Sequence, residues 1–132
     1  MIAQNLKELN IRWQRLVKNN RTCPRCRRTE KELIKAYTLL KKLLKPLGIK
    51  VTLKKEKLTL AEFRKDPLKS NQILINNKPL EKWLSARKGE SPCCDICGPV
   101  ECRTVETQGK IYETIPQALI IRACLKALVK IL

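Results

Sequence analysis

The sequence predicts an α/β fold with a mixed sheet flanked by helices, and three observations support this class. Apolar and polar residues alternate over 11–17 and again over 49–54, which is typical of strands with one face in water. Between these segments apolar residues recur every three or four positions, as in a helix that packs along one side. A helix that connects two strands makes them parallel neighbours, whereas Asn76-Asn77 predicts the tight turn of an antiparallel hairpin.

The first strand and the first long helix are the strongest elements of the pattern. The strand is predicted over 11–17, although Arg15 interrupts its apolar set, and a loop follows over 19–22. Thr29 and Glu32 fit a capping box at the start of the helix. The apolar stripe of the helix consists of Leu33, Ala36, Tyr37, Leu40 and Leu44.

Shorter elements complete the predicted sheet. The second strand, with its apolar residues at alternate positions, precedes a capping box over 59–62, which opens a short helix that ends before Pro67. The third strand is predicted over 72–75. Residues 78–80 return as a short edge strand, because proline has no N–H to donate to a central ladder. One or two helical turns follow over 81–86.

The region before the last helix is predicted to be an insertion, over about 88–115. Its Gly, Ser, Pro and Cys content predicts a loop over 88–99, and 103–107 is predicted to pair with 110–114 around a Gln-Gly turn. Pro116 then opens a final helix that is apolar on more than one side. Such a helix needs a second cover, and a homodimer through this C-terminal helix would supply one.

The composition excludes several classes of catalytic and metal site. The 132 residues include 29 Lys and Arg against 12 Asp and Glu, which gives a formal net charge of +17, with seven cysteines and no histidine. A Ser-His-Asp triad, a Cys-His protease site and a His-ligated metal are therefore excluded. The length predicts a single domain over 1–132.

Location and partners follow from the same counts. The N-terminus has no apolar signal-peptide core, and charges interrupt the most apolar stretch, 115–132, so no membrane association is expected. We expect a cytoplasmic protein, in which cysteines are more often metal ligands or redox groups than static disulfides. The basic charge suits a solvated surface or a polyanion such as nucleic acid. Since the basic residues are dispersed and only five residues are aromatic, the solvated surface is favoured.

The first cysteine site is Cys23-Pro24-Arg25-Cys26, between the first strand and the first long helix. The spacing lets the two sulfurs come close, and a helix that begins at Cys23 would favour a thiolate there. If the helix begins at Thr29 instead, the motif lies in a turn of the kind that binds zinc. Positive charge that should lower the thiol pKa further comes from four neighbours: Arg21, Arg25, Arg27 and Arg28.

The second cysteine site consists of Cys93, Cys94, Cys97 and Cys102, four cysteines within ten residues of a polar segment. Ligation by thiolates alone suits zinc, an iron–sulfur cluster or a soft thiophilic ion, including a metalloid. A metal shared by Cys94, Cys97 and one or both of Cys23 and Cys26 is a second possibility. Disulfides are the third, for instance with the first site, where this segment would act as an internal resolving partner. Cys124 lies on the apolar terminal helix and is predicted to be a buried small hydrophobic residue.

The order of elements and the position of the Cys-x-x-Cys motif resemble the thioredoxin and glutaredoxin fold. Residues 72–78 are similar to the glutaredoxin strand-turn-strand, although Ser70-Asn71 stands where thioredoxins place a cis-proline. The further pattern of 91–94 and 101–104 more closely resembles a small microbial family that is grouped with thioredoxin-like domains and known mainly as a domain of unknown function.

This resemblance implies a thiol–disulfide redox protein in which Cys23 attacks and Cys26 resolves, with the cysteines of 93–102 as a second thiol centre. Its partners would be a disulfide-bearing protein or a thiol reductant, and no cofactor would be required. The alternative is a thiolate protein that binds zinc or another thiophilic metal on the same scaffold. A basic nucleic-acid-binding protein is a further alternative.

Overall fold

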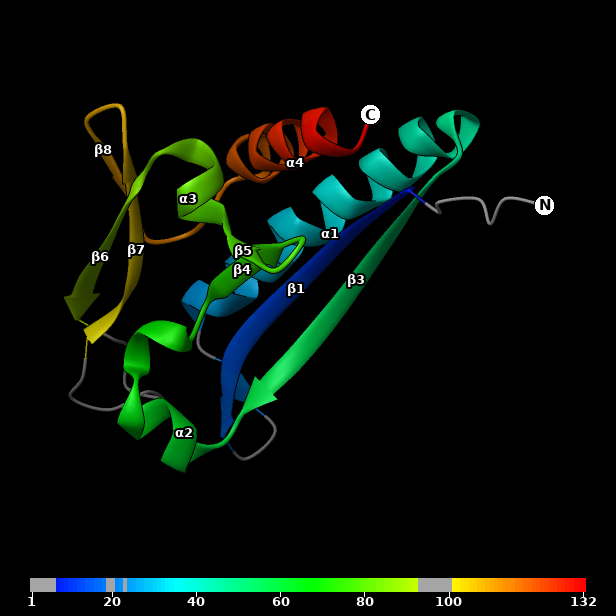
Figure 1. Ribbon diagram of the computed structural model, residues 1–132. Coiled ribbons are helices and arrows are strands. Elements are labelled where there is room, and N and C mark those ends of the chain that lie inside the picture. The colour runs from blue at the N-terminus through cyan, green and yellow to red at the C-terminus, as the bar shows by residue number, and fades with distance from the viewer. Residues whose placement is uncertain (1–6, 19–20, 23, 93–100) are drawn as a thin grey trace.

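Two β-sheets with helices beside them make up the part of the chain that the structure describes (Figure 1). The structure is a computed structural model, and it describes residues 7–18, 21–22, 24–92 and 101–132. Only the backbone is described for residues 18, 21, 22, 92, 101 and 102.

The elements of the larger sheet and its connections come first along the chain. They are β1 (Lys7–Lys18), β2 (Arg21–Thr22), α1 (Pro24–Leu44), η1 (Lys45–Leu47), β3 (Ile49–Leu58), α2 (Leu60–Lys65), η2 (Pro67–Lys69), β4 (Gln72–Ile75) and β5 (Lys78–Pro79). The remaining elements are α3 (Leu80–Leu84), β6 (Arg87–Pro92), β7 (Glu101–Thr107), β8 (Lys110–Tyr112) and α4 (Gln117–Ile131).

Strand β1 lies inside the larger sheet, whose order is β3-β1-β4-β5, and β2 pairs with the end of β1. β1 runs parallel to β3, and α1 connects the two. β4 is antiparallel to β1, and β5 is antiparallel to β4. Asn76 and Asn77 close the last turn with φ of 48° and 65°, which asparagine tolerates. The predicted mixed α/β sheet, with a parallel crossover and an antiparallel hairpin, is confirmed.

Helices α1 and α4 lie side by side along one face of this sheet (Figure 1). The core between helices and sheet includes Leu9, Ile11, Trp13, Leu33, Leu40, Ile73, Ile120 and Ala123. The opposite face is polar: Asn10 Oδ1 accepts a hydrogen bond from Thr52 Oγ1 at 2.6 Å, and Arg12 Nη2 lies 2.9 Å from Glu56 Oε1. The alternation seen in the sequence therefore separates a helix-covered face from a wet one.

The capping box expected at Thr29 and Glu32 does not start α1, which begins at Pro24. Thr29 Oγ1 instead accepts the N–H of Ile115 at 3.2 Å, and Glu32 Oε1 accepts the N–H of Gln117 at 3.0 Å. Both side chains thus bind the backbone that leads into α4. The prediction of a helix start at Thr29 is wrong, because this polar pair caps a different helix.

The insertion before α4 is a three-stranded antiparallel sheet, β6-β7-β8. The loop predicted over 88–99 is therefore wrong up to Pro92, because β6 pairs with β7. A Cβ at Gly89 would lie 2.5 Å from Thr104 Oγ1, so any other residue at this position of β6 requires the Thr104 side chain to move. The predicted pairing of β7 with β8 is confirmed, and Gly109 in its turn has a φ of 77°.

Three further boundaries follow the expected signals, whereas two strands are longer than predicted: β1 begins at Lys7 and β3 ends at Leu58. α1 ends in η1 before Gly48, which has a φ of 72°, and the capping box between Thr59 and Glu62 opens α2. α4 begins directly after Pro116. The loop predicted over 19–22 is also wrong in its second half, because Arg21–Thr22 form β2.

Helix α4 is apolar on more than one side, as predicted. Leu119 and Ile120 are among its buried residues, whereas Leu125 and Val129 are exposed. A second copy of the chain as the cover of that exposed side stays a prediction. Among the helices that the structure describes, none has the length and apolar character required to cross a membrane.

Candidate functional site

Cys26 lies in the first turn of α1, and only 3% of the residue is exposed. Its Sγ is 3.7 Å from Ser70 Oγ, in the segment that leads into β4. The same Oγ accepts the N–H of Leu16 in β1 at 3.1 Å, so its hydroxyl hydrogen is available to the cysteine sulfur. A thiol and a hydroxyl therefore meet where α1, β1 and β4 converge.

Asn71 holds this segment in place through three hydrogen bonds. Its N–H donates to the carbonyl of Gln14 at 2.7 Å, and its Oδ1 accepts from Trp13 Nε1 at 3.1 Å. Its Nδ2 donates to the carbonyl of Glu113 at 3.5 Å. Asn71 is buried and has a φ of 64°, a left-handed conformation that asparagine adopts more readily than most residues. The segment that carries Ser70 is thus held by β1 on one side and by the residue that follows β8 on the other.

Arg25, the neighbour of Cys26, is buried and binds the region around the smaller sheet. Its Nη2 donates to the carbonyl of Arg103 at 2.8 Å, and its Nε donates to the carbonyl of Glu113 at 3.2 Å. Its Nη1 also lies 3.6 Å from the Glu113 carboxylate. Of the other arginines expected around Cys23, Arg27 and Arg28 are exposed, and the side chain of Arg21 lies outside the described residues.

Arg103 in β7 extends this polar cluster toward α3. Both Arg103 and Glu81 are buried, and they form an ion pair in which Arg103 Nε lies 2.6 Å from Glu81 Oε2. Arg103 Nη1 donates to the carbonyl of Leu68 in η2 at 2.6 Å. The start of β7 is therefore connected both to α3 and, through Arg25, to the first turn of α1.

Most of the cysteines singled out in the sequence lie outside the described residues: Cys23, Cys93, Cys94 and Cys97. Cys102 belongs to β7 and pairs with Ser91 in β6, but its side chain is not described. Among residues 7–18, 21–22, 24–92 and 101–132, no group of three or more Cys, Asp or Glu is arranged to hold a metal ion. The pairing of Cys23 with Cys26 and the metal set at 93–102 therefore stay predictions.

Cys124 is fully buried on α4. Burial away from water raises the pKa of its thiol to about 12 from an ordinary value of 9.0. Such a thiol is not ionised at neutral pH, so Cys124 has the character of the small apolar residue predicted for this position.

Arg15 is a residue that the sequence pattern marked as an irregularity and not as a site. Its guanidinium carbon lies 4.9 Å from the centroid of the Trp13 ring. Its Nε and Nη1 are buried and have no hydrogen-bond partner within the part of the chain that the structure describes. The sequence signal for this residue was an arginine within an alternating apolar pattern. A charged side chain at a core-facing position is costly unless it has a partner.

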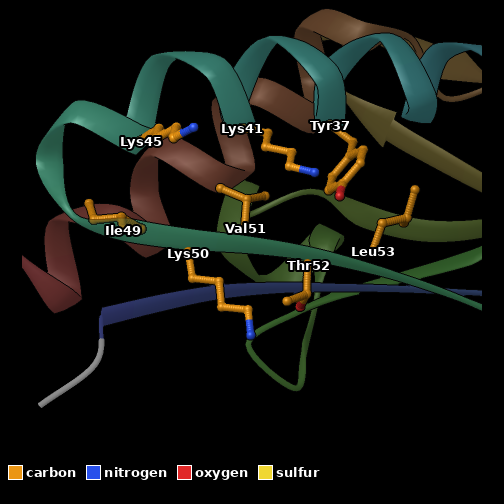
Figure 2. Close-up of a pocket in the computed structure, with 8 residues that line it drawn as sticks. All are labelled: Tyr37, Lys41, Lys45, Ile49, Lys50, Val51, Thr52 and Leu53. Carbon is orange, nitrogen blue, oxygen red and sulfur yellow. The ribbon is translucent and has the colours of Figure 1, made fainter.

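A groove of about 450 Å³ lies between the last turns of α1 and the start of β3. Figure 2 shows Tyr37, Lys41 and Lys45 from the helix above Val51 and Leu53 of the strand. From Cys26 to Tyr37, the first residue of α1 that lines the groove, the helix rises by about 16 Å at 1.5 Å per residue. The groove is therefore separate from the surroundings of Cys26.

Comparisons with known proteins match most of the length of the chain. The family described as "Domain of unknown function (DUF2703)" matches residues 9–124. The chain is also 42% identical over 113 residues to an "Uncharacterized protein" of Archaeoglobus fulgidus, an alignment that covers 86% of this chain and 82% of the relative. No solved structure matches the chain.

Proposed function

The chain belongs to the DUF2703 family, and we propose that it is a thiol–disulfide redox protein of the thioredoxin-like type. Cys23 is the attacking thiol and Cys26 the resolving thiol. The observation that supports this assignment best is the place of Cys26, buried in the first turn of α1 beside Ser70 Oγ. A buried sulfur is poorly accessible to a large substrate, so it suits the second, internal attack.

The order of the elements supports the thioredoxin-like part of the proposal. Parallel β1 and β3 joined by a helix, followed by the antiparallel β4-β5 hairpin and a last helix, are the arrangement that the resemblance implies. Pro24 begins α1 directly after Cys23 in the sequence. A thiol at that point is next to the positive end of a 21-residue helix, which favours the thiolate.

The reaction proposed for this site is a two-step exchange. The Cys23 thiolate attacks one sulfur of a substrate disulfide, the S–S bond breaks, and one substrate thiolate leaves with a proton from water. The Cys26 thiol loses its proton and attacks the Cys23 sulfur of the mixed disulfide, which releases the second substrate thiol. The substrate gains two electrons and the protein becomes a disulfide, which an external dithiol reductant reduces again.

Single cysteine variants test this assignment. We expect Cys23→Ser to abolish reduction of a small disulfide, and Cys26→Ser to accumulate a mixed disulfide that intact-mass spectrometry detects. Cys124→Ala is the matched control, because it removes a buried cysteine that takes no part, and it should keep the wild-type rate. The proposal fails if the wild type reduces no disulfide or if Cys23→Ser retains the rate.

The segment from Cys93 to Cys102 supports a second candidate function, a thiolate metal or metalloid site. β6 and β7 are antiparallel, with Pro92 opposite Glu101 and Ser91 opposite Cys102. The two ends of the cysteine-rich segment are therefore held together at one end of a hairpin, which limits the distance over which its thiols spread.

One measurement separates the two candidates. Protein purified without reductant or chelator is analysed for bound metal. Its free thiols are counted by mass spectrometry after alkylation. About one equivalent of zinc or another thiophilic metal favours the metal site. Less than about a tenth of an equivalent, with the thiols of the segment reduced and intact, contradicts it.

A further inference from the structure

Arg15 offers an anion-binding group beside the proposed redox site. It lies in β1 between Gln14, whose carbonyl accepts the N–H of Asn71, and Leu16, whose N–H donates to Ser70 Oγ. Neighbouring residues of a strand point to opposite faces, so Arg15 shares the face of Trp13. Trp13 and Cys26 are both part of the buried hydrophobic core. Arg15 is therefore at the end of the sheet where Cys26 meets Ser70.

The guanidinium of Arg15 is held in one orientation without being neutralised. The Trp13 ring lies 4.9 Å from its central carbon, and the Trp13 indole is itself fixed by its 3.1 Å hydrogen bond to Asn71. Stacking on an aromatic ring orients a guanidinium but satisfies none of its N–H groups. Two of its nitrogens, Nε and Nη1, are buried without an acceptor among the described residues. Buried donors of this kind are costly unless something binds them.

Three carboxylates on elements near this site are already paired with other cations. Glu30 of α1 lies 3.1 Å from the ammonium of Lys55, and Glu113 lies 3.6 Å from Arg25. Glu81 forms its ion pair with Arg103. Within the described part of the chain, Arg15 has no carboxylate within ion-pair distance. The anion that satisfies it has to come from outside this set.

We propose that Arg15 binds a carboxylate of the disulfide substrate, so that the site prefers acidic disulfides. This inference rests on the proposed function, because it assigns a substrate class to the same site. Guanidinium groups bind carboxylates with two parallel hydrogen bonds, and they do so most strongly where water is excluded. Arg15 is a specificity-determining residue in this proposal, and the sulfur chemistry remains with the cysteines.

Three disulfides of similar size and different charge test the proposal: dithiodipropionate, a dianion; hydroxyethyl disulfide, which is neutral; and cystamine, a dication. We expect the wild type to reduce dithiodipropionate about 10-fold faster than hydroxyethyl disulfide, as one charge-assisted hydrogen-bond pair allows. Arg15→Gln should remove that preference while its rate with hydroxyethyl disulfide stays within about 2-fold. Arg15→Lys should keep part of the preference, because it retains the charge without the fork geometry.

Arg27→Gln is the matched control, since Arg27 is an exposed arginine on the turn of α1 that carries Cys26. It should leave the preference intact. A second measurement does not depend on any variant: suberate, a dicarboxylate with the length of dithiodipropionate and no sulfur, should compete with that substrate in the wild type.

The outcomes separate this inference from the proposed function. If the wild type shows no charge preference, if suberate does not compete, or if Arg27→Gln removes the preference equally, Arg15 is not a substrate carboxylate site. If Arg15→Gln slows all three disulfides equally, Arg15 acts on the thiols, and the specificity role is again overturned. Failure of the proposed function looks different, because then hydroxyethyl disulfide itself is not reduced by the wild type.

Discussion

At the scale of single residues, the surroundings of a cysteine decide its chemistry more than burial alone. Cys26 and Cys124 are both buried, at 3% and 0% exposure. The sulfur of Cys26 lies beside the Ser70 hydroxyl, where a polar group is available to it. Cys124 is enclosed by the apolar core of α4, and this is why the pKa of its thiol is raised to about 12.

The raised pKa of Cys124 predicts a loss of stability in alkaline solution. In the unfolded chain the thiol ionises near 9.0, whereas in the folded protein it stays neutral up to about 12. The folded state therefore has its full stability below pH 9 and loses it as the pH rises toward 12. Between pH 8 and pH 10 the wild type should lose about 1.4 kcal/mol more than Cys124→Ala, measured by urea unfolding. Equal losses would contradict the assignment.

The residues around Cys26 show what sequence patterns reveal at this scale and what they do not. The Cys-x-x-Cys motif and the buried character of Cys124 were both visible in the sequence. The role of Asn71 was not visible, because it depends on a hydrogen bond to Trp13, more than fifty residues away. The role of Arg15 was not visible either, because it depends on the position of its guanidinium over the Trp13 ring. In the sequence, Arg15 was visible only as a charged residue at a position expected to be apolar. That irregularity marks the residue as unusual but does not identify its role.

At the scale of elements, two side chains of α1 bind the backbone at the start of α4. Glu32 of α1 accepts the N–H of Gln117, the first residue of α4, and Thr29 accepts the N–H of Ile115. The hydrogen bond from Gln117 lowers the pKa of Glu32 below its ordinary value of 4.5, with a further contribution from Lys35. A carboxylate at this position also complements the positive end of the α4 dipole.

This cap predicts a graded effect of substitutions at Glu32. Glu32→Ala should destabilise the protein by about 1 kcal/mol at pH 7, and Glu32→Gln by less, because the amide oxygen still accepts the bond. Since the folded pKa is lowered, the stabilisation is present above pH 4.5 and disappears as the pH falls through the folded pKa. Urea unfolding at pH 7 and pH 3 measures both effects.

Lys35→Ala is the control for this prediction. It removes the ion pair between Lys35 Nζ and Glu32 Oε2, which are 3.2 Å apart, and leaves the cap on Gln117 in place. A loss from Lys35→Ala as large as that from Glu32→Ala would mean that the ion pair, not the cap, stabilises the fold.

Element boundaries were predictable where the signal is local and failed where it is not. The capping box at Thr59 and Glu62 and the hairpin turn at Asn76 and Asn77 lie where they were expected, since their hydrogen bonds or dihedrals involve adjacent residues. The same Thr-x-x-Glu spacing at Thr29 serves another helix. β6 was missed because its glycine and proline resemble a loop until β7 is there to pair with it.

At the scale of the whole molecule, buried arginines join the smaller sheet to the larger one. Arg103 connects β7 to Glu81 of α3 and to the carbonyl of Leu68 in η2, and its own carbonyl accepts from Arg25 of α1. The contribution of arginines to the contact between the two sheets was not predictable from composition, because the dispersed basic residues suggested a solvated surface. In the structure, Arg25 and Arg103 are buried and hold the smaller sheet beside the larger one.

The buried pair of Arg103 and Glu81 predicts strong coupling between the two sheets. Arg103→Ala and Glu81→Ala should each destabilise by about 3–5 kcal/mol, because each leaves an uncompensated buried charge. The double variant should lose much less than the sum of the two, since neither charge is then left alone. Urea unfolding of the four proteins in a double-mutant cycle measures the coupling.

A second pair calibrates that cycle. Arg12 and Glu56 lie 2.9 Å apart on the wet face of the larger sheet, and their side chains are 34% and 24% exposed. Because solvent screens this pair, its coupling should stay below about 1 kcal/mol. If the two pairs give the same coupling, or if the Arg103 and Glu81 losses simply add, the smaller sheet is held by its apolar contacts and not by the buried ion pair. Placement of β7, and with it Cys102, next to the first turn of α1 would then have to come from side chains such as Val105, which is fully buried.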